Sequence, residues 1–355
     1  MKTTLTLLAI VSVLAALSGC GGSGNTDATY PPGVVQIKGA GSTFSSLLFK
    51  QWFAAYPKDH PNTAIAYDSV GSGEGVRRFI GQNIEEKEKV DFGASDGAMS
   101  DEELARVSSG AVLLPVTASS VVLAYNLPDF KGALKLSRKA YAGIFLGEIK
   151  SWDDPLIAES NPGAALPKLP IVTVVRKDSS GTTFAFTNHL SAISQTWHSR
   201  YGPLYVVDWP SSPMRANGNE GVAGRIKVSL GSIGYVSYGF AQKGELSMAV
   251  LQNQMGTFIE PNANSGTATL AAAQMPKNLR LFMPDPAGPN SYPIVTLSWV
   301  LLYKKYVDAR KSETLRELFH WCLTDGQKYS HELGYDMLPP NVTEKALAAL
   351  NNVTP

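Results

Sequence analysis

The most informative stretch of the chain is Arg176-Lys177-Asp178-Ser179-Ser180-Gly181-Thr182-Thr183, which follows the apolar run 171–175. The run is β-branched and predicts a strand, and Phe184, Phe186 and Leu190 then follow at helical spacing. The stretch therefore connects a strand to the start of a helix. A helix start presents unpaired N–H groups and a partial positive charge, glycine lets an anion approach the backbone, and serine and threonine add hydroxyl donors. This combination favours a site for a small oxyanion.

Three further segments are rich in the same residue types. They are Gly39-Ala40-Gly41-Ser42-Thr43-Phe44, Gly71-Ser72-Gly73-Glu74-Gly75 and Asp91-Phe92-Gly93-Ala94-Ser95-Asp96. The first two precede apolar residues of helical period, as the 176–183 stretch does. Any single segment is explained by an ordinary helix cap. Several helix starts aimed at one point, together with one arginine, would form a cage for an oxyanion.

In residue sequence and order, three of these segments resemble motifs of the periplasmic phosphate-binding proteins of bacterial phosphate ABC transporters. That family shows G-A-G-x-T-F, then D-F-G-A-S-D, then R-x-D-x-S-G-T, and this chain contains all three in that order. Weaker matches are Ile149-Lys150-Ser151-Trp152-Asp153-Asp154, Gly234-Tyr235-Val236 and Tyr292-Pro293-Ile294. The resemblance extends from about Lys38 to about Thr343.

The resemblance implies an α/β, two-lobed periplasmic-binding-protein fold with a ligand cleft between the lobes. Residues 34–118 plus 294–355 would form lobe I and residues 119–293 lobe II, with chain crossings near 116–120 and 289–294. It also implies a function, which is high-affinity binding of inorganic phosphate outside the cytoplasmic membrane and delivery to the permease and ATPase subunits of an ABC transporter.

The resemblance also implies which residues bind phosphate. Lobe I would offer Ser42, Thr43, Phe44, Ser72 and Asp96, and lobe II would offer Arg176, Ser180, Gly181 and Thr182. Asp178 would support the site by pairing with Arg176, whose guanidinium fork matches oxyanion geometry.

Two acidic residues affect what such a site can bind. Asp96 would accept the proton that phosphate still carries near neutral pH and would repel sulfate, which carries none. Glu74 departs from the G-S-S-G-G of many family members and would suit the dipole of a first helical turn. We expect Glu74 to face solvent, because a carboxylate in the cleft would compete with phosphate.

The N-terminus has the composition of an export signal. Met1-Lys2 is basic, residues 5–17 are apolar, and Leu17-Ser18-Gly19-Cys20 fits a bacterial lipobox. We expect a signal peptide at 1–19, a lipid on Cys20 and a flexible, lipid-anchored tether at 20–33. The alternative is an ordinary secretory signal with an incidental cysteine.

Composition excludes several other classes of protein. The 31 Lys and Arg residues against 30 Asp and Glu argue against a nucleic-acid partner. Cys322 lies in the apolar helical stretch 315–323, where a buried small hydrophobe is expected rather than a reactive thiol. The sequence contains no C-x-x-C or H-E-x-x-H, so we expect no metal site and no cofactor, and we expect a monomer.

Alternative functions stay open at this point. Gly93-Ala94-Ser95-Asp96-Gly97 matches the G-x-S-x-G nucleophile elbow, with His189, His198, His320 or His331 as possible bases. However, the elbow requires a helix directly after the serine, and here the helix signal begins only at Ser100-Asp101. Binding of another oxyanion, such as sulfate or molybdate, is a second alternative. A surface lipoprotein that scavenges phosphate without a transporter is a third.

The pattern of apolar residues predicts the remaining elements. Strands are expected at 34–37, 63–67, 90–93, 112–116, 120–125, 233–238 and 294–303. Helices are expected at 45–56, 75–80, 140–146, 221–228, 267–274, 310–331 and 342–350, with shorter ones opening after Ser100 and Asp154.

Overall fold

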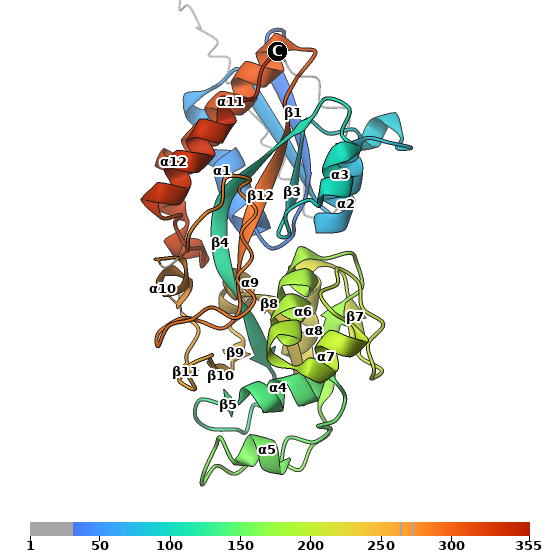
Figure 1. Ribbon diagram of the computed structural model, residues 1–355, viewed down its shortest axis with the longest axis vertical. Coiled ribbons are helices and arrows are strands. Elements are labelled where there is room, and N and C mark those ends of the chain that lie inside the picture. Colours follow the sequence, from blue (N-terminus) through green and yellow to red (C-terminus); the bar gives the residue numbers. More distant parts are fainter. Residues whose placement is uncertain (1–30, 263–264, 272) are drawn as a thin grey trace, which may run out of the picture. The chain divides into compact units, whose positions relative to one another are not determined.

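The computed structural model describes residues 31–262, 265–271 and 273–355 (Figure 1). The predicted signal peptide, Cys20 and most of the tether lie outside these residues. In the described part of the chain, no helix has the length and apolar character needed to cross a bilayer.

One mixed sheet of nine strands organises the described residues. Its path is β2 (Thr63–Ser69), β1 (Val35–Gly41), β3 (Phe92–Ser95), β12 (Val295–Tyr303), β4 (Ala111–Tyr125), β8 (Ser232–Ser237), β6 (Val172–Arg176) and β7 (Met214–Ala216), and β9 (Ser247–Met248) pairs with β4. A small second sheet contains β11 (Phe258–Ile259), β10 (Val250–Gln252) and β5 (Lys135–Leu136). β1 is parallel to β2 and β3, and β6 is parallel to β7 and β8. The strands β4 and β12 between these groups are antiparallel to their neighbours.

The strand β4 passes through both groups without a break (Figure 1). The expectation of two strands at 112–116 and 120–125 is therefore wrong. The polar residues between them stay in the sheet because β12 pairs with β4 as far as Ser120, and β8 takes over from Val121. The register of β4 with β12 shifts at a bulge beside Val116, but pairing continues on both sides of it, so the strand does not end there.

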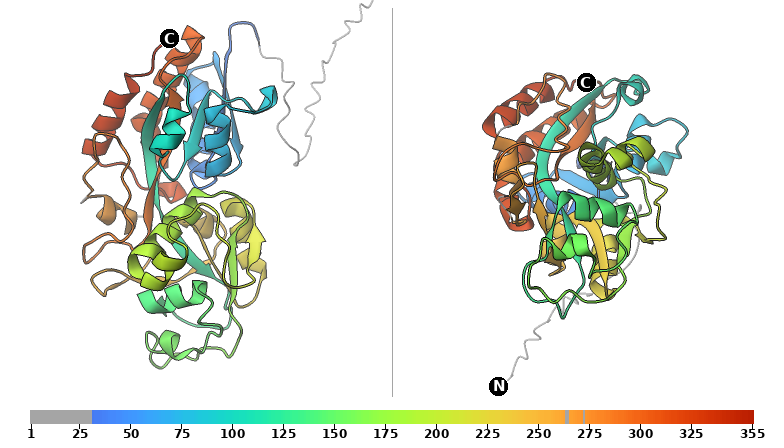
Figure 2. Two further views of the ribbon diagram at one scale, coloured as in Figure 1. Left: turned by 45° about the vertical axis from the view of Figure 1, so that its right-hand side comes forward. Right: turned by 60° about the horizontal axis from the view of Figure 1, so that its bottom comes forward.

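Helices cover the sheet around two apolar cores. The first core receives α1 (Ser46–Asp59), α2 (Ser72–Ile80), α3 (Asp101–Ala105), α10 (Ser265–Ala271), α11 (Ala309–Leu323) and α12 (Pro340–Leu350). The second receives α4 (Arg138–Phe145), α5 (Pro155–Ala158), α6 (Gly181–Ile193), α7 (Gln195–Arg200), α8 (Gly218–Val228) and α9 (Tyr238–Lys243). In both Figure 1 and Figure 2, α11 and α12 lie across β4 and β12 from α2 and α3. Below, "first half" and "second half" mean the parts of the fold built on these two cores.

The two cores are separate clusters of large side chains. Trp52, Phe92 and Trp299 are buried in the first, and Trp152 and Tyr235 in the second. Each cluster is large enough to stabilise its own half through burial of apolar surface. Each half of the fold therefore has an apolar core of its own.

The helix α11 is shorter than the predicted helix 310–331. It ends at Leu323, and 3₁₀ helices follow at Asp325–Tyr329 and His331–Leu333. The backbone of Thr324 leaves helical geometry, with φ −115° and ψ −96°, and the indole N–H of Trp52 donates to the carbonyl of Gly326 in the following 3₁₀ helix at 2.7 Å. Cys322, on the same helix, is fully buried, as predicted.

Candidate functional site

The four polar segments meet at the carboxyl ends of parallel strands. Ser42 follows β1 and Asp96 follows β3, and the register pairs Gly41 with Ala94. Because neighbouring parallel strands end at the same edge, the two side chains come together, and the Ser42 hydroxyl donates to Asp96 at 2.5 Å. In the second half, Arg176 is the last residue of β6, and α6 begins five residues later at Gly181.

The carboxylate of Asp96 accepts three serine hydroxyl bonds. Ser42 and Ser298 donate to Oδ1 at 2.5 and 2.7 Å, and Ser72 donates to Oδ2 at 3.2 Å. Burial raises the pKa of Asp96, while these hydroxyls and the charge of Arg176 act to lower it. Ser42 and Ser72 were expected to donate to the anion; in the structure their hydroxyl protons are directed to Asp96.

The guanidinium of Arg176 is held by the carboxylate of Asp178. Its Nε donates to Oδ1 at 2.8 Å and Nη2 donates to Oδ2, while Nη1 donates to the Thr182 hydroxyl at 3.3 Å. Burial acts to raise the pKa of Asp178, but the bonds and charge of Arg176 outweigh it, and the pKa is lowered. The Arg176 side chain is 2% exposed, so its charge is largely removed from water.

The start of α6 is capped by a serine. Ser180 is the N-cap, and its hydroxyl accepts from the N–H of Thr183 at 3.1 Å. Gly181 and Thr182 form the first turn, where a helix leaves N–H groups unpaired. Phe44, in the segment that follows β1, is fully buried in the second core, and its carbonyl accepts a hydrogen bond from the Tyr335 hydroxyl at 2.6 Å.

The two halves touch each other over the site. The N–H of Gly73 donates to the carbonyl of Ser179 at 3.1 Å. A Cβ built on Gly181 would lie 2.6 Å from Oγ of Ser72 and 2.7 Å from Cβ of Asp96. The predicted site residues are accordingly buried: Ser42, Thr43, Phe44, Ser72, Asp96, Arg176, Ser180, Gly181 and Thr182.

Glu74 is engaged by arginines of its own helix. Arg77 donates to both of its carboxylate oxygens, at 2.7 and 2.8 Å, and Arg78 donates to Oε1 at 2.8 Å. The hydrogen bond from Arg77 leads the effects that lower the pKa of Glu74 to about 2. The charge of Glu74 is therefore balanced outside the cluster formed by Asp96 and Arg176.

Sequence reasoning missed two side chains that the fold brings to the cluster. Ser298 lies in the apolar strand β12 and carried no local signal. Asn219 lies in the first turn of α8 and bonds to Thr43 and Thr182. Its segment, Asn217-Gly218-Asn219-Glu220-Gly221, precedes the predicted helix 221–228 and has the polar, glycine-rich character of the other four, which could have identified it.

The residues of the nucleophile-elbow pattern are engaged in other contacts. The hydroxyl of Ser95 donates to the carbonyl of Gly97 at 2.6 Å. The ring of His189, one candidate base, is fully buried and bonds to the Tyr141 hydroxyl at 2.8 Å and the Pro284 carbonyl at 2.6 Å. These contacts do not form a serine–histidine pair.

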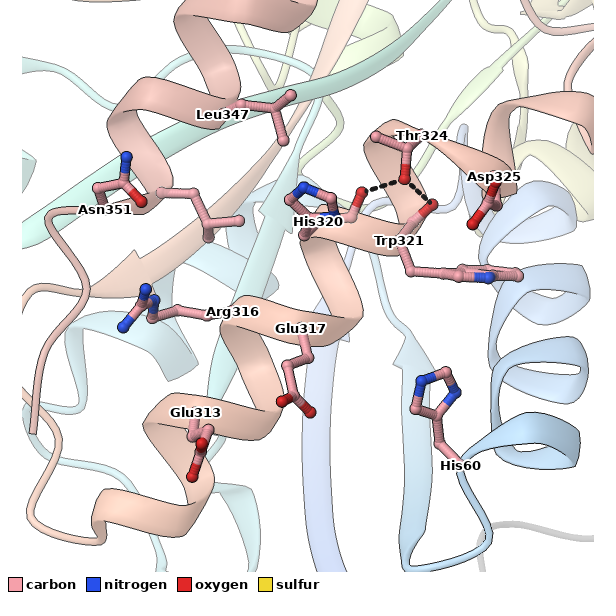
Figure 3. Close-up of a pocket in the computed structure, with 11 residues that line it drawn as sticks. His60, Glu313, Arg316, Glu317, His320, Trp321, Thr324, Asp325, Leu347 and Asn351 are labelled. Atoms are coloured by element: carbon pink, nitrogen blue, oxygen red, sulfur yellow. Dashed lines mark hydrogen bonds between the residues drawn. The ribbon is translucent and has the colours of Figure 1, made fainter.

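A separate surface hollow of about 640 Å³ lies along α11 and the end of α12 (Figure 3). His60, Glu317 and His320 are among its lining residues, and none of the predicted site residues belongs to it. Within the described residues, no group of three His, Cys, Asp or Glu side chains has the arrangement of a metal site. This hollow and the polar cluster are therefore distinct features of the molecule.

Comparisons of the sequence with known proteins agree on one family. A family model described as "PBP superfamily domain" matches residues 26–325. The phosphate-binding protein PstS of Pasteurella multocida is 38% identical over 88% of this chain and 89% of its own length. PstS of Xylella fastidiosa (strain Temecula1) is 36% identical over 92% of this chain and 89% of its own length.

Solved structures show the same fold. A high affinity periplasmic phosphate-binding protein, PfluDING, solved with phosphate at pH 8.5, aligns with a TM-score of 0.72 at 21% identity, over 88% of this chain and 93% of that one. A phosphate binding protein from Stenotrophomonas maltophilia aligns with a TM-score of 0.69 at 19% identity, over 89% of this chain and 94% of that one. The α/β architecture is thus that of the periplasmic binding proteins.

Proposed function

Because the chain belongs to the PstS family of phosphate-binding proteins, we propose that it binds inorganic phosphate outside the cytoplasmic membrane and delivers it to an ABC transporter. The binding residues in this proposal are those expected from the sequence, namely Thr43, Phe44, Ser72, Asp96, Arg176, Ser180, Gly181 and Thr182. Asp178 supports Arg176, and Ser42 supports Asp96, because its hydroxyl donates to Asp96 and its N–H to the carbonyl of Ala94.

The observation that carries the proposal is a buried carboxylate inside a cluster of donors. An ionised carboxylate has about four acceptor positions, and three serine hydroxyls occupy three of those of Asp96. No further donor to this carboxylate is found among the described residues, which leaves one position for a donor on the ligand. Phosphate near neutral pH carries such a proton and sulfate does not, so the arrangement favours phosphate.

The positive side of the site comes from Arg176 and from helix starts. Asp178 balances much of the arginine charge, so a tightly held anion also needs the N–H groups of Gly181 and Thr182 and hydroxyl donors. The Arg176–Asp178 pair and the capped start of α6 are each held within the second half, which reduces the ordering cost of binding.

Calorimetric titration of the purified mature chain tests the proposal directly. We expect binding of phosphate and at least about 10⁴-fold weaker binding of sulfate, because an unmet buried acceptor rejects an analogue by roughly that factor. In thermal unfolding, phosphate at a hundred times its dissociation constant should add about 2.7 kcal/mol of stability. Stronger binding of sulfate or molybdate than of phosphate would contradict the proposed ligand.

Transport requires that the two halves move. We propose that residues 34–118 plus 294–355 and residues 119–293 act as two lobes, and that the permease recognises a monomer closed over phosphate. Contacts such as that between Gly73 and Ser179 support this view, since they cross from one half to the other. Deletion of the gene should reduce phosphate uptake by the native host at low phosphate, and unchanged uptake would favour scavenging.

We further propose that the chain binds phosphate without converting it, and a reactive-serine probe that labels Ser95 would contradict this.

For the N-terminus we propose export and a lipid on Cys20. Cys20→Ser should move the protein from the detergent phase to the aqueous phase, because each buried methylene of the lipid contributes about 0.8 kcal/mol. Mass spectrometry that finds Cys20 unmodified in the native host would refute the lipid anchor.

A further inference from the structure

The amide of Asn219 connects two threonines of the proposed phosphate site. Its Nδ2 donates to Oγ1 of Thr43 at 3.0 Å and to Oγ1 of Thr182 at 3.1 Å. Its own backbone N–H also donates to Oγ1 of Thr43, at 3.1 Å. Thr43 belongs to the first half of the fold, and Thr182 and Asn219 belong to the second.

The orientation of this amide is fixed by the strand beside it. The backbone N–H of Ser237, at the end of β8, donates to Oδ1 of Asn219 at 2.9 Å. Because a backbone N–H can only donate, the atom it faces must be the amide oxygen, and the NH₂ group must point to the threonines. Asn219 is fully buried, so water does not compete for these bonds.

These bonds leave each threonine hydroxyl able only to donate its proton. A hydroxyl has one proton and two lone pairs. Thr43 accepts twice from Asn219, and Thr182 accepts from Asn219 and from Nη1 of Arg176 at 3.3 Å. Among the described residues no protein acceptor takes the proton of either hydroxyl, so both protons are available to an acceptor bound in the site.

We propose that Asn219 is a positioning residue that makes Thr43 and Thr182 obligate hydrogen-bond donors to the bound anion. The inference rests on the proposed phosphate binding and adds to it. Ser42 and Ser72 donate to Asp96. The two threonines therefore supply hydroxyl donors that Asp96 does not consume. Because Asn219 bonds to Thr43 in the first half and to Thr182 in the second, the direction of these hydroxyl protons depends on the contact between the two halves.

The first test reverses the polarity of the amide. Asn219→Asp puts an acceptor where Nδ2 donates, so the threonine protons turn to the carboxylate and are lost to phosphate. Each hydrogen bond to a charged group contributes about tenfold or more in affinity, and two such bonds are lost. Phosphate affinity should therefore fall at least about 100-fold. Asn217→Asp is the matched control, because it adds the same charge two residues away at an exposed side chain that makes no cap bond. The control should bind within about threefold of the parent.

The second test separates positioning from structural support. Asn219→Ala should lower phosphate affinity about tenfold in the parent chain. In a Thr43→Val background the factor should be at least about threefold smaller, because one hydroxyl that Asn219 orients is already gone. A purely structural role predicts the same factor in both backgrounds. Thermal unfolding without phosphate shows which variants are folded. If Asn219→Asp does not fold, the comparison of Asn219→Ala in the two backgrounds is the deciding test.

The outcomes distinguish a chain that does not bind phosphate from one in which Asn219 does not orient the threonines. Failure of the parent chain to bind phosphate contradicts the proposed function itself. Binding by the parent, together with equal factors in the two backgrounds or with Asn219→Asp binding as well as Asn217→Asp, overturns only the role of Asn219.

Discussion

At the scale of single residues, the site is defined by how its hydroxyl protons are shared. Three serine hydroxyls donate to Asp96, whereas the Thr43 and Thr182 hydroxyls are surrounded by donors. The site thus combines an acceptor with one free position and donors with free protons. A monoprotonated oxyanion complements both.

Replacing Asp96 tests the acceptor. Asp96→Asn keeps one oxygen, adds a donor and removes the charge that repels a fully ionised anion. Sulfate should gain affinity by a larger factor than phosphate does, so the phosphate-to-sulfate affinity ratio should shrink. Titrations of both anions into both proteins at one pH and salt give the ratio. If it is unchanged, selectivity resides in the donors and Asp96 is a structural residue.

Replacing Arg176 tests the charged donor. Arg176→Ala removes a fork donor and leaves Asp178, whose side chain is only 16% exposed, without its partner. Phosphate affinity should fall by about a factor of ten to a hundred or more, and stability should also fall by roughly 3 kcal/mol. Adding Asp178→Ala should restore part of the stability but none of the affinity. An Arg176→Ala variant that binds phosphate within twofold of the parent would remove Arg176 from the site.

At the scale of elements, two helix starts approach each other closely within the polar cluster. Ser72 opens α2 and Gly181 opens α6, and the two residues lie in contact. Only glycine at position 181 allows this, because a Cβ there would meet Ser72 and Asp96 within 2.7 Å. The sequence preference at this position is therefore set by the opposite half of the fold.

Gly181→Ala should weaken phosphate binding without unfolding the protein. The added methyl group keeps α2 and α6 apart, and overpacking of this kind costs about 1–3 kcal/mol, or roughly a 5- to 150-fold loss of affinity. Gly224→Ala in α8 is the control, since its Cβ would meet no atom within 4 Å and should raise stability by up to about 1 kcal/mol. Calorimetry and thermal unfolding of both variants check this. Equal affinities for the two variants would contradict the close approach.

At the scale of the whole molecule, buried polar contacts join segments that are distant in sequence. His189 on α6 bonds to Tyr141 on α4 and to the carbonyl of Pro284. Beside it, Arg138 forms a two-bond ion pair with Asp285, both bonds at 2.8 Å. These contacts hold the long segment before β12 against the second core.

The buried histidine predicts how stability depends on pH. Burial lowers the pKa of His189 to about 4, so the folded chain keeps this ring neutral where the unfolded chain, with a pKa near 6.5, binds a proton. Stability should therefore fall as the pH falls from about 6.5 to about 4, by at most about 3 kcal/mol from this group. His189→Gln should reduce that slope, whereas His198→Gln, at an exposed position of α7, should not. Thermal unfolding across this pH range measures both, and identical slopes would exclude His189 as the source.

Much of the fold and the site could be predicted from sequence because the signals are local. The strand β6, the N-cap Ser180 and the start of α6 follow one another within a dozen residues. Arg176 and Asp178 are separated by one residue, so their pairing needs no knowledge of the rest of the chain. The export signal and Cys20 are likewise patterns of adjacent residues, and they stay predictions because they lie outside the described residues.

The tertiary structure alone decided features that depend on distant partners. Ser298 reaches Asp96 across 202 positions, and Trp52 bonds to Gly326, just beyond α11, across 274. The single long strand β4 exists because β12 and β8 pair with its polar middle and its far end in turn. Asn219 acquires its role only where the two halves meet, because its amide bonds to a threonine from each. Caps and periodicity are properties of neighbouring residues, whereas the direction of a hydroxyl proton depends on every group packed around it.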